Sequence, residues 1–228
     1  MGPMELVTLK NINKVYKTKT SIQTHALHDI NLAIQEREFV VLAGPSGSGK
    51  TTLLNIIGTL DRPTSGEVYI RGVEVTRLSR NDTANLRLRE IGFVFQDYSL
   101  INVLTALENV EYVMLLQGVN SYTRRKKSEE ILKAVGLGDL IHRRPYQMSG
   151  GQQQRVAVAR AIAAEPHIIL ADEPTANLDS NTGESLIDLM KSFNVSEGIT
   201  FIISSHDPMV IQRAGRLIRL KDGRVQED

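Results

Sequence analysis

The fold of this chain is decided by the stretch GPSGSGKT at positions 44–51, which reads Gly44, Pro45, Ser46, Gly47, Ser48, Gly49, Lys50 and Thr51. It matches the phosphate-binding loop (P-loop) pattern G-x-x-x-x-G-K-[ST] at every specified position. Its glycines let the backbone curl with N–H groups pointing inward, which forms a nest for an anion. The apolar run 39–43 before it predicts a buried strand, and the run 51–57 after it predicts a helix. Because a helix N-terminus carries partial positive charge, the stretch predicts a nucleotide site.

Nucleotide binding and hydrolysis also need groups that hold the phosphates, the metal ion and the attacking water, and the sequence offers candidates for each. Lys50 can reach the β- and γ-phosphates of a nucleotide, and the Thr51 hydroxyl can bind Mg²⁺. The apolar run 168–171 predicts a second buried strand, which ends in Asp172 and Glu173. An acid at the end of a strand beside a P-loop holds Mg²⁺ in nucleotide-hydrolysing proteins. We expect Asp172 to be the metal partner, which leaves Glu173 to polarise the attacking water as general base.

The segment 148–155, MSGGQQQR, predicts the start of a helix that continues through the apolar residues 156–163. Ser149 at the cap and Gln152 at the third helical position form a capping box. Gly150 and Gly151 leave the helix N-terminus bare, so an anion can approach it closely. Taken alone, such a box is usually an ordinary helix start. Its position just before the acidic strand indicates a further role.

Together these segments resemble the nucleotide-binding domains of ABC transporters, and the resemblance covers the whole chain. MSGGQ resembles the family's LSGGQ signature, with Met148 in place of Leu, a change that conserves volume. The other matching positions, in the family's order, are the aromatic residue that stacks on adenine, Tyr16; the Q-loop glutamine, Gln96; the D-loop, residues 177–179; and the switch histidine, His206. Taken alone, His206 reads as an ordinary loop residue and Tyr16 as a strand residue.

The resemblance implies a role for each position. ATP would be bound by Tyr16, by the P-loop and by Thr52, and Mg²⁺ by Thr51, Gln96 and Asp172. Catalysis would depend on the four side chains of Lys50, Gln96, Glu173 and His206. The signature residues Ser149, Gly150, Gly151 and Gln152, with Asp179 of the D-loop, would face ATP held by a second copy. Two copies would therefore form a head-to-tail homodimer around two ATP molecules.

The predicted fold class is α/β: a P-loop NTPase core with a mostly parallel sheet, an N-terminal antiparallel β subdomain and an inserted α-helical subdomain. Residues 4–228 are expected to form a single ATPase domain, with its core at 4–96 and 148–228 and the helical subdomain at about 97–147. Helices are predicted at 106–116 and 124–135, and short β runs over 4–43. Residues 1–3 read as a cloning or protease scar.

Composition restricts the classes of partner. The 228 residues carry a net charge of +1 and no cysteine, so nothing indicates a nucleic-acid partner or a disulfide. The basic cluster 124–127 is interpreted as a solvated helix face. No apolar run approaches the roughly 20 residues of a membrane span, and no signal peptide is recognised. We therefore expect any membrane pathway to lie on another chain.

Two segments, 58–66 and 104–110, resemble the LolD, MacB and FtsE group, which serves lipoprotein release, macrolide or peptide export and cell-division signalling. This implies an ATP hydrolase at the cytoplasmic face of the membrane. Its partners would be a permease that binds near 96–109 and a periplasmic or extracellular accessory protein. A soluble ABC ATPase of DNA repair or of the ribosome is the alternative. ABC proteins of DNA repair carry a long coiled coil between the P-loop and the signature, where this chain has only about a hundred residues. ABC proteins that act on the ribosome carry two nucleotide domains in one chain, and this chain has one.

Overall fold

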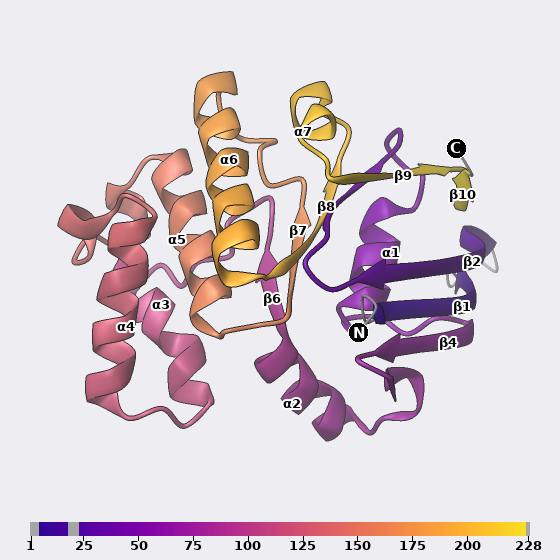
Figure 1. Cartoon of the computed structure of the whole chain (residues 1–228), viewed down its shortest axis with the longest axis horizontal. Helices are drawn as coiled ribbons and strands as arrows, with labels where there is room; N and C mark the ends of the chain where they lie inside the picture. Colours follow the sequence, from indigo (N-terminus) through magenta and orange to yellow (C-terminus); the bar gives the residue numbers. More distant parts are fainter. Residues whose placement is uncertain (1–4, 18–22, 227–228) are drawn as a thin grey trace.

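The computed structural model describes residues 5–17 and 23–226, and the predicted scar at residues 1–3 lies outside them. The chain is arranged from a β-rich end, across a central sheet, to a helical lobe at the opposite end (Figure 1). Among the described residues, no helix combines the length and the apolar character that crossing a membrane requires.

The β-rich end is a four-stranded antiparallel sheet of order β2-β1-β4-β5. Its long strands are β1 (Glu5–Lys17) and β2 (Gln23–Gln35), which pair along most of their length. Its short strands, β4 (Ser65–Ile70) and β5 (Val73–Glu74), come from a later segment, after the first helix. The predicted antiparallel subdomain is confirmed, although it is interleaved with the core.

The prediction of short β runs over 4–43 is wrong in one respect, because β1 and β2 are each 13 residues long. The register between them shifts on both sides of Ile12, next to Asn11 and Asp29, whose φ values are 52° and 47°. Such β-bulges interrupt the alternation of buried and exposed side chains without ending a strand. The sequence pattern therefore looks broken where the strand is continuous.

The central sheet has six strands in the order β10-β9-β3-β8-β7-β6, and all of its neighbouring pairs are parallel except β9 and β10. Parallel strands end at the same edge of a sheet, so the segments after β3, β7 and β8 meet there. The mostly parallel core is therefore confirmed. Its strands are β3 (Phe39–Ala43), β6 (Ile91–Val94), β7 (Ile168–Asp172), β8 (Thr200–Ser205), β9 (Arg216–Lys221) and β10 (Arg224–Gln226).

Helices cover both faces of this sheet and form the lobe beyond it. The α-helices of the core are α1 (Lys50–Ile57), α2 (Arg80–Glu90), α6 (Ser180–Glu197) and α7 (Pro208–Gln212), and short 3₁₀ turns lie at Val75–Arg77, Gly138–Leu140 and Pro145–Gln147. The lobe contains α3 (Ala106–Leu116), which matches the prediction, and α4 (Ser121–Ala134). The predicted start of α4 at Arg124 is three residues late, because the Asn120 side chain accepts from the Thr123 amide and caps the helix earlier.

The helix α5 (Gly150–Ala163) joins the lobe to the core. Val156, Ala159 and Ala163 pack in the apolar core of the lobe, together with residues of α3 and α4. Val158 and Ile162 pack instead with the central sheet and α6. Because one helix contributes to two cores, the boundaries of the helical subdomain at 97 and 147 remain a prediction.

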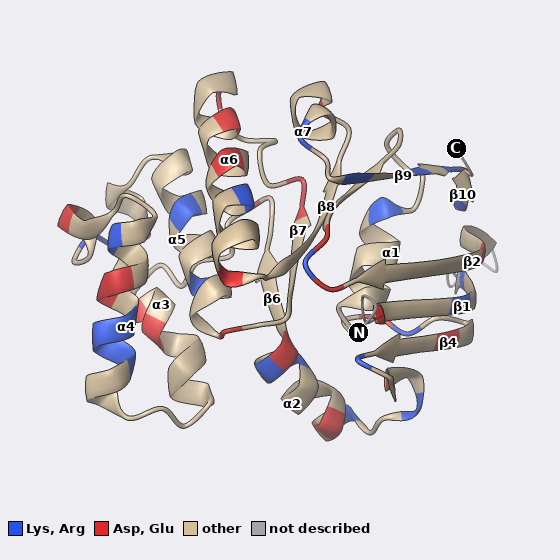
Figure 2. Ribbon diagram, in the orientation of Figure 1, with Lys and Arg blue, Asp and Glu red and all other residues tan. Residues whose placement is uncertain are grey.

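Charged side chains of both signs are distributed over most elements (Figure 2). In the basic cluster of α4, Arg125 lies 3.1 Å from Glu129, and Lys127 forms an ion pair with Glu165. These pairs are typical of a solvated helix face.

Candidate active site

The P-loop follows β3 along a path that its glycines permit. A Cβ on Gly44 would lie 2.1 Å from the carbonyl oxygen of Leu220, and one on Gly49 would lie 2.6 Å from that of Ala26. Gly47 and Gly49 have φ values of 78° and 103°, in the left-handed region. Gly49 is also the N-cap of α1, and no described side chain caps this helix end. The first N–H groups of α1 are therefore available to an anion.

Two polar side chains of the loop, those of Lys50 and Ser48, are buried. Lys50 is 6% exposed, and its Nζ donates to the carbonyl oxygens of Gly44 at 2.8 Å and Pro45 at 3.1 Å. The Ser48 Oγ is buried and forms no hydrogen bond with any described residue. A buried ammonium whose hydrogen bonds go to neutral carbonyls and an unpaired hydroxyl are groups that phosphate oxygens would satisfy. The loop therefore fits a nucleotide phosphate.

The end of β7 brings a carboxylate to this loop. The Thr51 Oγ1 donates to Asp172 Oδ1 at 3.1 Å, and the Ser204 hydroxyl donates to the same oxygen. The second contact follows from the sheet register, in which Asp172 lies opposite Ser204. A hydroxyl and a carboxylate side by side are hard oxygen ligands of the kind that Mg²⁺ prefers, so this pair fits the metal.

Glu173 lies directly after β7 with a φ of 44°, which is rare for a residue that is not glycine. Its amide donates to the Ser204 carbonyl at 3.1 Å, which helps to hold this strained conformation. Its carboxylate lies 2.9 Å from His206 Nδ1 and 3.9 Å from Lys50 Nζ. The Glu173 side chain is 17% exposed and that of His206 is 69% exposed. A largely buried carboxylate is thus held between the P-loop lysine and a histidine.

Tyr16 lies beside the helix that follows the P-loop. Its hydroxyl donates to Asp61 at 2.8 Å, and the Lys14 ammonium lies 4.7 Å from its ring centroid. Burial and the hydrogen bond to Asp61 raise the pKa of the Tyr16 phenol, whereas the nearby Thr52 hydroxyl lowers it. The ring is therefore neutral, and at 41% exposure it retains an accessible surface.

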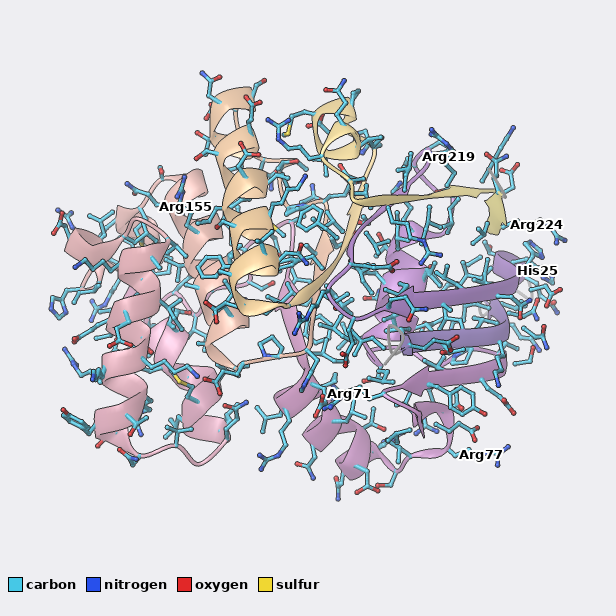
Figure 3. All side chains as sticks on the ribbon, in the orientation of Figure 1. His25, Arg71, Arg77, Arg155, Arg219 and Arg224 are labelled. Atoms are coloured by element: carbon cyan, nitrogen blue, oxygen red, sulfur yellow. The ribbon has the colours of Figure 1, made fainter. Side chains whose placement is uncertain are left out.

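The signature segment forms the predicted capping box. The Ser149 Oγ accepts from the Gln152 amide at 3.3 Å, and the Gln152 Oε1 accepts from the Ser149 amide at 2.9 Å. Among the described residues, no hydrogen bond or ion pair joins 149–152 to the P-loop. Two labelled residues show where the motifs lie (Figure 3). Arg155 directly follows the signature segment, and Arg219 lies opposite Ala43 at the end of β3, just before the P-loop. The two residues are on opposite sides of the molecule. The two motifs therefore do not form one site within a single chain.

Comparison with known proteins agrees with this geometry. The family model of ABC transporters matches residues 27–176. The chain belongs to the ABC transporter family. It is 48% identical to the ABC transporter ATP-binding protein MJ1508 of Methanocaldococcus jannaschii, with 97% of this chain and 98% of the relative covered. It is 46% identical to the lipoprotein-releasing system ATP-binding protein LolD of Anaeromyxobacter dehalogenans, with 97% and 93% covered.

A solved structure of the cassette MJ0796 from M. jannaschii is also similar to this ABC cassette. That structure is a dimer in a post-hydrolysis state bound to ADP and Pi, and it matches with a TM-score of 0.90, 48% identity and 97% of each chain covered. The resemblance to the LolD and MacB group is confirmed, and so is the P-loop NTPase fold. This chain is an ATP-binding and ATP-hydrolysing subunit of an ABC transporter.

Two other predicted site residues of the cassette form no hydrogen bond or ion pair with the P-loop cluster within the described part of the chain. Asp179 caps α6, where its carboxylate accepts from the Thr182 amide at 3.0 Å. Hydrogen bonds from Thr182 lower the pKa of this carboxyl. Gln96 is exposed, and only its carbonyl, which accepts from the Asn177 Nδ2 at 3.0 Å, forms a hydrogen bond in the described structure. The structure thus brings together Lys50, Thr51, Asp172, Glu173 and His206, but not Gln96, Asp179 or the signature residues.

Sequence reasoning missed a further function of the signature glycines. A Cβ on Gly150 would lie 2.6 Å from the Tyr98 hydroxyl, and one on Gly151 would lie 2.4 Å from the Thr182 methyl group. A Cβ at either position would therefore force a neighbouring side chain of the ABC cassette to shift, besides any role of these glycines toward an anion. Sequence reasoning also missed Ser204, which the parallel register of β7 and β8 would have placed beside Asp172.

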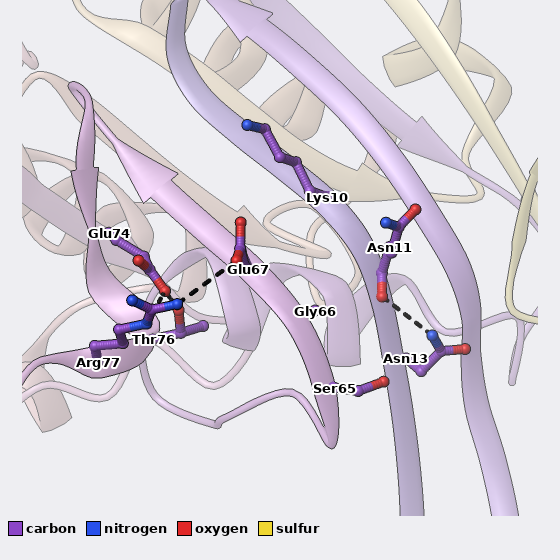
Figure 4. A pocket seen from close by; sticks show the side chains of 9 residues that line it. All are labelled: Lys10, Asn11, Asn13, Ser65, Gly66, Glu67, Glu74, Thr76 and Arg77. Carbon is purple, nitrogen blue, oxygen red and sulfur yellow. Dashed lines mark hydrogen bonds and ion pairs between the residues drawn. The ribbon is translucent and has the colours of Figure 1, made fainter.

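A separate hollow of about 610 Å³ lies on the antiparallel sheet of the cassette, away from the P-loop (Figure 4). Of its two cations, Lys10 and Arg77, the second is paired with Glu74 at 2.9 Å and with Glu67 at 3.8 Å. The Thr76 hydroxyl also donates to Glu74. The acids of this hollow are thus already partnered, and none of the predicted site residues line it.

Proposed function

We propose that two copies of this ABC cassette close head to tail around two molecules of Mg²⁺-ATP and that closure and hydrolysis drive a separate membrane permease. The observation that carries the proposal is the convergence of Lys50, Thr51, Asp172, Glu173 and His206 at the mouth of an uncapped P-loop helix. Asp172, Glu173 and His206 lie at the ends of β7 and β8, and Lys50 and Thr51 begin the helix that follows the neighbouring β3. Such sheets bind their ligands at this edge.

The P-loop and its neighbours bind the nucleotide in this proposal. Lys50 would exchange its two carbonyl acceptors for β- and γ-phosphate oxygens, which are charged and bind an ammonium more strongly. Mg²⁺ would be held by Thr51 and Asp172, with Gln96 as a third ligand on family grounds, and would neutralise charge on the phosphates. Tyr16 would stack on the adenine through its neutral ring.

Glu173 is the general base in this proposal. Its carboxylate accepts a proton from the water whose oxygen attacks the γ-phosphorus, while the bond from that phosphorus to the bridging oxygen breaks and ADP leaves. His206, at 2.9 Å from the carboxylate, orients it and can contact the γ-phosphate. Lys50 stabilises the charge on the phosphoryl group in the transition state.

The signature helix is proposed to act on the nucleotide of the second copy. Its N–H groups at Gly150 and Gly151 lie at a helix N-terminus, where an anion is favoured. Asp179 begins the adjacent α6 and would face the same interface. The dimeric state of MJ0796, which carries ADP and Pi, supports this arrangement.

A groove of about 620 Å³ supports the permease as partner. It runs between α2, β6 and the helices of the lobe, and its exposed apolar rim includes Leu60 and Leu116. The guanidinium groups of Arg87 and Arg160 also line it. An apolar groove of this kind suits one amphipathic helix of a partner, which here would be a segment of the permease. It extends to Ser99, within the region 96–109 expected from the family.

This partner would place the cassette at the cytoplasmic face of the membrane as a peripheral subunit. The 46% identity to LolD supports a permease for lipoprotein release, export or mechanotransmission. A periplasmic or extracellular accessory protein rests on the same group resemblance. A DNA-repair or ribosomal function is not supported by any of these observations.

The concentration dependence of ATP hydrolysis tests the proposal. Because each site needs two copies, the rate of phosphate release per protein molecule should rise with protein concentration, and chelation of Mg²⁺ should abolish it. The Lys50→Ala protein gives the background rate. A rate per molecule that is constant over a wide concentration range, and higher than this background, would show that one copy hydrolyses ATP alone.

A further inference from the structure

Gln154 is a fully buried polar residue on the signature helix that the proposed chemistry does not use. Its side chain has an exposed fraction of 0%, in a region of α5 otherwise rich in valine and alanine. A buried amide is unfavourable unless it forms hydrogen bonds, so its contacts call for an explanation.

The amide of Gln154 connects two loops that are far apart in the sequence. Its Nε2 donates to the Pro174 carbonyl at 2.8 Å and to the Phe95 carbonyl at 3.3 Å. Phe95 directly precedes Gln96, and Pro174 directly follows Glu173. One side chain therefore fixes the peptide next to the proposed third ligand of Mg²⁺ and the peptide next to the proposed general base.

The contact with Pro174 acts on a strained segment. Glu173 has a φ of 44°, and a left-handed residue of this type persists only where its surroundings hold it. The Ser204 carbonyl accepts from the Glu173 amide on the near side, and Gln154 holds the Pro174 carbonyl on the far side. Removal of one restraint would let the carboxylate move away from the P-loop.

The other polar atom of this side chain has no partner. The Oε1 of Gln154 is buried and accepts no hydrogen bond from any described residue. The amide is thus retained for its two donors, at the expense of an unsatisfied acceptor.

We propose that Gln154 is a positioning residue that couples the signature helix to Gln96 and Glu173. A displacement of α5 when its N-terminus meets the second copy's nucleotide moves this amide, and the amide moves both loops together. This inference rests on the proposed function, because it takes the roles of Gln96 and Glu173 from there.

The substitution Gln154→Met tests the inference, because it keeps the length of the side chain and removes both donors. ATP affinity should stay within about twofold of wild type, since the P-loop and Tyr16 are unchanged, while kcat should fall roughly tenfold or more. Gln153→Met, which removes an amide from the neighbouring position of the same helix, is the matched control and should retain the wild-type kcat. An unchanged kcat in Gln154→Met, measured per folded molecule, overturns the assignment.

A double-mutant cycle with Glu173→Gln separates positioning from a general structural effect. If Gln154 acts through Glu173, adding Gln154→Met to Glu173→Gln should lower the single-turnover rate little further, because the base is already absent. Fully multiplicative losses contradict the coupling. If Glu173→Gln alone hydrolyses ATP at the wild-type rate, the proposed function fails. If Glu173→Gln is inactive and Gln154→Met is normal, only the present inference fails.

A second variant covers the outcome that Gln154→Met does not fold. Gln154→Glu has the same shape, and burial raises the pKa of a carboxyl, so its protonated form can donate one hydrogen bond. Its kcat, relative to wild type at the same pH, should recover as the pH falls from 8 to 6. A relative kcat that does not change with pH contradicts the positioning role.

Discussion

The P-loop region and the signature region are each built around a helix N-terminus, but only the second of these helix ends is capped by side chains. The N-cap of α1 is Gly49, no described side chain caps this helix end, and the first helical residue is the buried Lys50. The helix α5 begins with a complete capping box formed by Ser149 and Gln152. The first terminus is therefore left for a phosphate to satisfy, whereas the second is stable in a single copy.

The two helix N-termini also differ in the side chains that surround them. The first is surrounded by residues from across the sheet, with Asp172 and Glu173 held close to the P-loop. Ser149 and Gln152 hydrogen-bond to each other, and Gly150 and Gly151 lie against Tyr98 and Thr182. The comparison indicates one half-site that can bind nucleotide alone and another that functions only against a second copy.

The largest effect on ATP binding is expected from a substitution in the half-site formed by the P-loop. Lys50→Ala removes charge-assisted bonds to two phosphates and should weaken ATP binding by about 3 kcal/mol, or a hundredfold. Titration with a fluorescent ATP analogue measures this. Lys126→Ala, at an exposed lysine of α4, is the control and should bind normally. Equal affinities of Lys50→Ala and wild type would remove the P-loop from the binding site.

Loss of the base should affect turnover without affecting binding. Glu173→Gln keeps the size of the side chain but cannot accept a proton, so the rate of phosphate release should fall at least about a hundredfold. ATP should still bind, and dimers should accumulate, which light scattering after size-exclusion chromatography detects. Glu130→Gln at an exposed acid is the control. A wild-type rate in Glu173→Gln would mean that another group activates the water.

The second half-site can be broken separately. Ser149→Arg in the Glu173→Gln background removes the cap and adds bulk at the start of α5. The ATP-dependent dimer should disappear, while the affinity of the monomer for ATP should change little, because Lys50 and Tyr16 are intact. Ser121→Arg at the start of α4 should leave the dimer unchanged. If Ser149→Arg weakens monomer binding as much as Lys50→Ala does, with a normal circular dichroism spectrum, the signature acts within one chain.

The smallest effect on ATP affinity is expected from substitution of Tyr16, at the edge of the half-site formed by the P-loop. Tyr16→Leu removes the aromatic face and should weaken ATP binding roughly tenfold, as expected for stacking of a base on an aromatic ring. Tyr16→Phe keeps the ring and loses only the hydrogen bond to Asp61, so its affinity should stay near that of wild type. Isothermal titration compares the two. Equal losses in both variants would assign the effect to the hydroxyl instead of the ring.

The sequence predicted the parts of this molecule whose signal is local. The P-loop, the strand that ends in Asp172 and the capping box at Ser149 each lie within a short segment and follow from pattern and turn chemistry. The contact of Ser204 with Asp172 and the two donors of Gln154 depend on strand order and on packing, which short patterns do not encode. The continuous β1 and β2 were missed because bulges near Asn11 and Asp29 disturb the alternation of side chains.

The double attachment of α5 has a mechanical consequence. Val156 and Ala159 fasten this helix to the lobe, and Val158 and Ile162 fasten it to the sheet, from two sides of one rod. A lobe connected in this way is attached to the core by packed side chains as well as by the peptide chain. We expect a rotation of the lobe either to shift the packing on one face of α5 or to carry this helix with it, and so to be felt at the edge of the central sheet.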